Sequence, residues 1–126
     1  MRKLLTLLVG VLLGALSWGM AYAVSGTFEP FDSGIGFLVT QIVLSSAALL
    51  VGTRTGAIES VVLVAGGYVG MNVYSYAFGG SEAQAWAVLG LITTTALVLV
   101  PALAGLLGGI ARYLLARHRR RAAKQV

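Results

Sequence analysis

The stretch LVLVPALAGLLGGIARYLLARHRRRAAK, residues 97–124, indicates the fold most clearly. In it, a long apolar segment is followed directly by a cluster of basic side chains. An apolar segment of this kind is typical of a helix that crosses a lipid bilayer. A basic cluster at the end of such a helix is typical of the cytoplasmic side. The stretch therefore predicts a membrane-spanning helix with one fixed orientation.

The composition of the whole chain agrees with this interpretation. The 126 residues are 58% hydrophobic and only 10% charged, whereas soluble domains carry about 25% charged residues. Four acidic and nine basic side chains cannot cover the surface of a water-soluble domain. High hydrophobicity also excludes a disordered chain. We therefore expect an integral membrane protein with a single domain.

Three further apolar segments precede the last one. The predicted spans cover residues 4–24, 34–51, 57–78 and 85–110. At about 1.5 Å per residue, each span reaches or approaches the ~30 Å of a bilayer's hydrocarbon core. The fold class that follows is an all-α membrane protein with four transmembrane helices in two hairpins and both termini in the cytoplasm.

The segments between the spans are short. We expect a loop over residues 25–33, a tight turn over 52–56 and a second turn over 79–84, because these segments gather glycine, proline and charged residues. Residues 1–116 then form the transmembrane domain, and residues 117–126 form a basic cytoplasmic tail.

The orientation follows from the basic residues, which all fall on one side of the membrane in this topology. They are Arg2, Lys3, Arg54, Arg112, Arg117, Arg119, Arg120, Arg121 and Lys124. The loops on the other side hold Glu29, Asp32 and Glu82 and no base. Because basic loops stay in the cytoplasm, this asymmetry predicts a single orientation. The plasma membrane, the inner membrane of a bacterium, is the expected location.

Aromatic residues cluster at the ends of the spans opposite the bases, where amphipathic rings suit the headgroup layer. These residues are Trp18, Tyr22, Phe28, Phe31, Phe37, Tyr74, Tyr76, Phe78 and Trp86.

The first span has an alternative interpretation as a cleaved secretory signal. Arg2 and Lys3 precede a leucine-rich run, and Ala21-Tyr22-Ala23 resembles a cleavage site. The apolar run is longer than the ~7–15 residues of a usual signal core, which favours a retained helix. Cleavage would leave three spans.

Glycine pairs at a spacing of four residues lie in three of the spans, and this spacing lets two helix backbones approach closely. The pairs are Gly10 and Gly14, Gly66 and Gly70, and Gly105 and Gly109. They predict close packing within the bundle, with a dimer face as the alternative. Pro101 is expected to kink the last span or to free a backbone carbonyl.

Polar side chains inside the spans are the candidates for function. They are Gln41, Ser45, Glu59, Asn72 and Thr94. Gln41 and Ser45 share a helical stripe with Ala48 and Gly52, which should face another helix. Asn72 should meet Gln41, Ser45 or the threonines at 93–95, because an amide in hydrocarbon needs a partner.

Glu59 has two interpretations. As a first-turn carboxylate it meets the positive end of a helix and can pair with Arg54 or Arg112. As a site for a proton or cation, it would lie at the mouth of a pathway. Its position near the basic side favours the structural role.

Several kinds of chemistry are excluded or weakened by the residue counts. The chain has no cysteine and one histidine, His118, which excludes disulfides, thiolate metal sites and any site with two imidazoles. No paired carboxylates or Ser/His/Asp constellation lies in the spans. We therefore expect no enzyme activity, no cofactor and no metal.

The basic residues that follow the last span are expected to fix the topology or to contact anionic lipid headgroups. These residues are Arg112, Arg117, Arg119, Arg120, Arg121 and Lys124. Nucleic acid is not an expected partner.

The prediction for function is a small non-enzymatic membrane protein, an accessory or self-associating helix-packing component that packs beside its own copies or a larger membrane protein. The alternative is a small transporter or channel subunit, with a polar pathway lined by Gln41, Asn72 and the threonines of the last span.

Overall fold

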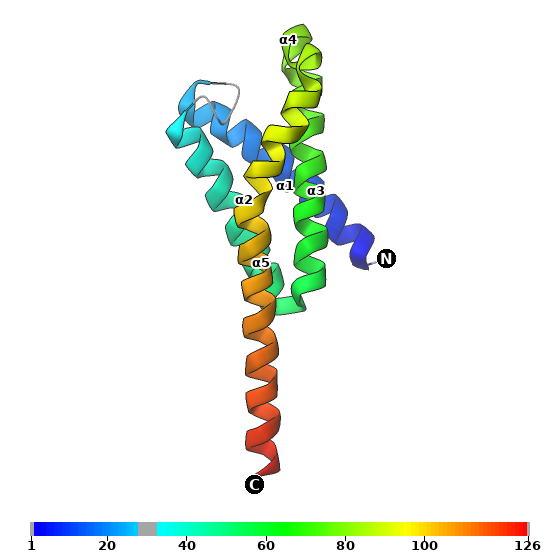
Figure 1. Ribbon diagram of the computed structural model, residues 1–126, viewed down its shortest axis with the longest axis vertical. Coiled ribbons are helices and arrows are strands. Elements are labelled where there is room, and N and C mark those ends of the chain that lie inside the picture. Colours follow the sequence, from blue (N-terminus) through cyan, green and yellow to red (C-terminus); the bar gives the residue numbers. More distant parts are fainter. Residues whose placement is uncertain (1, 28–32, 126) are drawn as a thin grey trace.

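The computed structural model describes residues 2–27 and 33–125, and within them the chain is almost entirely helical (Figure 1). Its helices are α1 (Arg2–Ser25), α2 (Gly34–Thr55), α3 (Ala57–Phe78), α4 (Gly80–Ala85) and α5 (Ala87–Lys124). Four of them, all except α4, are long and apolar enough to cross a membrane, as the sequence predicts. Phe28, Glu29, Phe31 and Asp32, predicted to lie in the first loop, fall outside the described residues.

The two short turns differ from their predictions. α2 continues to Thr55, so the predicted turn over 52–56 is reduced to Gly56. Gly56 has a φ of 115°, a conformation that residues with a side chain rarely adopt. The predicted turn over 79–84 instead forms the short helix α4, and Trp86 separates it from α5. The last helix runs without interruption to Lys124, so the predicted basic tail is helical.

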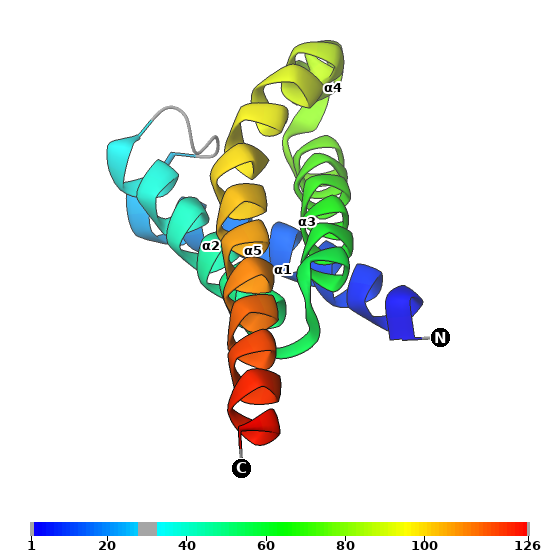
Figure 2. The same cartoon turned by 60° about the horizontal axis from the view of Figure 1, so that its bottom comes forward.

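The most extensive helix contacts join α1 to α3 and α2 to α5. Figures 1 and 2 show α1 crossing α3, while α5 lies along α2 and extends beyond the other helices. Sequential hairpins are therefore not the main packing units of the molecule. We call the end that holds Arg2, Arg54 and Arg112 the basic end, and the end that holds α4 and Trp86 the aromatic end.

Glycines decide which helices pair. A Cβ atom on Gly14 would lie 2.8 Å from the Cα of Gly67, and one on Gly108 would lie 2.8 Å from the carbonyl oxygen of Leu49. Such distances leave no room for a methyl group, so the backbones of these helices are in direct contact. The six glycines predicted to pack are buried: Gly10, Gly14, Gly66, Gly70, Gly105 and Gly109. They serve contacts within one chain.

The outer surface of the bundle is apolar, as lipid contact requires. Many leucine, isoleucine and valine side chains are more than half exposed, for example Leu12, Ile42 and Leu103. Between the helices, a small core of Trp18, Leu44, Met71 and Leu97 is almost fully buried.

Candidate functional site

Gln41 compensates for the proline inside α5. Pro101 has no N–H, so the carbonyl of Leu97, four residues earlier, lacks its usual helical donor. The Nε2 atom of Gln41 donates a hydrogen bond of 2.9 Å to that carbonyl oxygen. Figure 1 shows α5 changing direction between its yellow and orange parts, the region that contains the proline. The carbonyl freed by Pro101 thus forms part of the contact between α2 and α5.

The small polar stripe of α2 faces α5, as expected. Ala48 and Gly52 are buried, and Gly52 meets the backbone of Gly105. Ser60 of α3 donates a 2.9 Å hydrogen bond to the carbonyl oxygen of Ala48, which joins a third helix to this contact. Two buried oxygens, Oε1 of Gln41 and Oγ of Ser45, have no hydrogen-bond partner among the described residues.

Asn72 connects α3 to α5 through Thr94. The Nδ2 atom of Asn72 donates to Oγ1 of Thr94 at 2.9 Å and to the carbonyl oxygen of Tyr68 at 2.8 Å. Of the three partners expected for Asn72, the structure shows a threonine of the last span. The hydroxyl of Tyr68 adds a second link to α5, a 2.9 Å hydrogen bond to the carbonyl oxygen of Leu91.

Glu59 binds a hydroxyl group and not a guanidinium. The Oγ1 atom of Thr6, on α1, donates a 2.9 Å hydrogen bond to Oε2 of Glu59. Arg112 donates instead to the backbone carbonyl of Arg54, across the α2–α5 contact. Within the described chain, the expected pairing of Glu59 with Arg54 or Arg112 is therefore replaced by a polar contact between α1 and α3.

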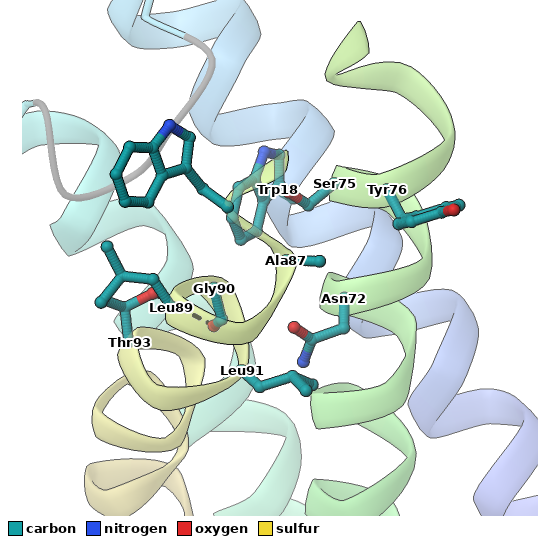
Figure 3. A pocket seen from close by; sticks show the side chains of 10 residues that line it. Trp18, Asn72, Ser75, Tyr76, Ala87, Leu89, Gly90, Leu91 and Thr93 are labelled. Carbon is teal, nitrogen blue, oxygen red and sulfur yellow. Dashed lines mark hydrogen bonds between the residues drawn. The ribbon is translucent and has the colours of Figure 1, made fainter. Parts of the chain in front are cut away.

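A cavity of about 270 Å³ opens near the aromatic end, between α1, α3 and the first turns of α5. Figure 3 shows Asn72 and Ser75 on one side, with the ring of Tyr76 directed away from the cavity, Ala87, Gly90 and Leu91 on another side, and the ring of Trp18 behind them. No charged side chain is among the lining residues that the structure describes. The cavity therefore combines hydrogen-bonding groups with aromatic surfaces.

The basic end carries a helical extension. α5 has 38 residues, which corresponds to ~57 Å at about 1.5 Å per residue, well beyond the ~40–45 Å of a bilayer with its headgroups. Its residues from 110 to 125 are all exposed. The bases of the extension beyond Arg112 are Arg117, Arg119, Arg120, Arg121 and Lys124.

The sequence indicates the polar candidates but not the cavity. Comparison with known proteins finds no matching family model, no similar curated protein and no similar solved structure. One signal in the sequence is related to the cavity: Trp18 and Trp86 are the two tryptophans of the chain, and both line it.

Proposed function

We propose that this chain is a non-enzymatic accessory protein of the plasma membrane that associates, through the basic extension of α5, with a larger membrane protein. The observation that carries the proposal is that extension, a helix with no packing partner in the described chain and a run of bases. Bases three or four residues apart, such as Arg117 and Arg121, repel each other on one helix. An anionic partner would relieve this repulsion.

The orientation in this proposal places the basic end in the cytoplasm, because bases stay on that side of the membrane. Arg2, Arg54 and Arg112 lie at one end of the bundle together with the extension, which supports this placement. A reporter fused to the C-terminus should be active only in the cytoplasm. Digestion of the basic end from outside intact cells would overturn the orientation.

Association is best tested by photo-crosslinking in native membranes. A photoreactive amino acid at Ala122, on the extension, should give one discrete protein adduct, whereas the same group at the exposed Leu99 should react with lipid. Replacing Arg119, Arg120 and Arg121 with glutamine should remove the adduct, and replacing Arg2 and Lys3 should leave it intact. Adducts to lipid alone from Ala122 would refute the accessory role.

The transport alternative has less support. Gln41 and Asn72 both bond to groups of α5, only Asn72 of the two lines the cavity, and the core of Trp18, Leu44, Met71 and Leu97 is almost fully buried. Solute flux into reconstituted vesicles that disappears in a folded Asn72→Leu variant would favour transport over the accessory role.

A further inference from the structure

The cavity at the aromatic end contains a hydrogen-bond acceptor, Oδ1 of Asn72, that receives only a long hydrogen bond from the protein. Asn72 is fixed in orientation, because its Nδ2 atom donates to the carbonyl oxygen of Tyr68, which can only accept. Its Oδ1 atom is therefore the acceptor of the amide. In Figure 3 this oxygen points toward the side of Gly90, and the nitrogen points toward Leu91.

Thr94 leaves this oxygen largely available. The hydroxyl of Thr94 has one proton and three acceptors in reach: the carbonyl oxygen of Gly90 at 2.8 Å, that of Leu91 at 3.2 Å, and Oδ1 of Asn72 at 3.3 Å. One proton serves one good hydrogen bond, and the shortest contact is with Gly90. The lone pairs of Asn72 Oδ1 can therefore accept from a molecule in the cavity.

The remaining lining defines the rest of such a molecule. Trp18 and Trp86 supply aromatic surfaces, and Ser75 supplies a hydroxyl. No described lining residue carries a charge, so an ionic ligand would lose its hydration without gaining a counter-charge. The volume of about 270 Å³ accommodates a single ring with a small substituent, since a cavity of about 150 Å³ holds benzene.

We propose that this cavity binds an uncharged molecule with one ring and a hydroxyl or N–H donor. The donor bonds to Oδ1 of Asn72, and the ring packs against the aromatic side chains. This binding site is independent of the association through the basic extension, because the two lie at opposite ends of α5.

Tryptophan fluorescence gives a direct test, because both tryptophans of the chain line the cavity. The probe is 4-bromobenzyl alcohol, whose bromine quenches tryptophan on contact. Its matched controls are 4-bromotoluene, which lacks the donor, and 4-bromobenzoate, which is charged. In detergent, the alcohol should quench the fluorescence of the full chain in a saturable way. After correction for partitioning into micelles, the alcohol should bind about 3- to 10-fold more tightly than 4-bromotoluene, which is the range for one hydrogen bond.

Two variants make the test specific. Asn72→Leu should abolish the preference for the alcohol. Gly90→Leu should block binding without disturbing the fold, because a Cβ atom there meets nothing within 4 Å, and it decides the question if Asn72→Leu does not fold. Gly34→Ala, at a similarly open glycine that does not line the cavity, should bind normally. Quenching that never saturates, or that Gly90→Leu leaves unchanged, would overturn the proposal.

Discussion

The hydrogen bond from Gln41 to the Leu97 carbonyl should depend on Pro101, and a double-mutant cycle can measure this dependence. In Gln41→Leu, a side chain of similar size replaces the donor, and the Leu97 carbonyl loses its 2.9 Å hydrogen bond. In Pro101→Ala, residue 101 regains an N–H that can donate to the same carbonyl along the helix. The loss of Gln41 should therefore cost less in the Pro101→Ala background.

The expected coupling energy is about 0.6–1.7 kcal/mol, the average and upper values for hydrogen bonds between membrane helices. The buried Oε1 atom of Gln41, which lacks a partner among the described residues, complicates the single variant because its removal is itself favourable. That contribution is the same in both backgrounds and cancels in the cycle.

The assay is reversible unfolding in mixed micelles at increasing fractions of sodium dodecyl sulfate, followed by tryptophan fluorescence and circular dichroism. Ser46 offers a matched control, because it lies on α2 but is exposed. Ser46→Leu and Pro101→Ala should therefore be additive. Costs of Gln41→Leu that agree within about 0.3 kcal/mol in the two backgrounds would show that the proline and the glutamine act separately.

Three further predictions concern two glycines, Gly14 and Gly56, and the retention of α1. Gly14→Ala should destabilise the bundle by about 1–3 kcal/mol through overpacking, because its Cβ would press on the backbone of Gly67. Gly19→Ala, with an ordinary 3.5 Å contact to Tyr74, should unfold at nearly the wild-type detergent fraction. Equal losses of stability in the two variants would contradict the packing argument. Gly56→Ala should cost about 1–2 kcal/mol because of the φ of 115°, measured in the same unfolding assay beside Gly34→Ala; an unchanged midpoint would mean that the turn is not strained by a side chain. The mature chain should retain α1, because cleavage after Ala23 would expose the glycines of α3 that pack on Gly10 and Gly14; mass spectrometry of the purified protein checks this, and a mass lacking residues 1–23 would refute it.

The sequence predicts the spans well because crossing a bilayer demands long apolar segments, and this demand leaves little freedom. It predicts the stripe of Gln41 on α2 and the role of Asn72 as a contact between helices, because a buried amide needs a partner. Pro101 marks a missing N–H, but nothing local indicates that Gln41 supplies the substitute donor. That pairing depends on how α2 and α5 are aligned in space.

Helix pairing could not be predicted for a related reason. Short connections suggest that neighbours in the chain also pack together, yet the most extensive contact is made by α1 with α3. The close fit between the glycine faces of α1 and α3 decides this pairing. Neither helix shows this fit by itself, so it cannot be predicted from one segment of the sequence. The same holds for the cavity, because its lining comes from three helices together: Trp18 of α1, residues of α3 such as Asn72, and the first turns of α5.

The way the glycines are used also restricts how copies of this chain can associate. Glycine pairs often mark dimer faces in membranes, but here a methyl group on Gly66 or Gly105 would already collide with the chain's own α1 or α3. A second copy therefore cannot use these faces without first separating helices of the bundle. Most of the large exposed side chains on the spans are aliphatic, such as Leu12 and Leu103, and lipid solvates these equally well. The use of these glycine faces within the described chain is a further reason to seek the partner at the basic extension of α5.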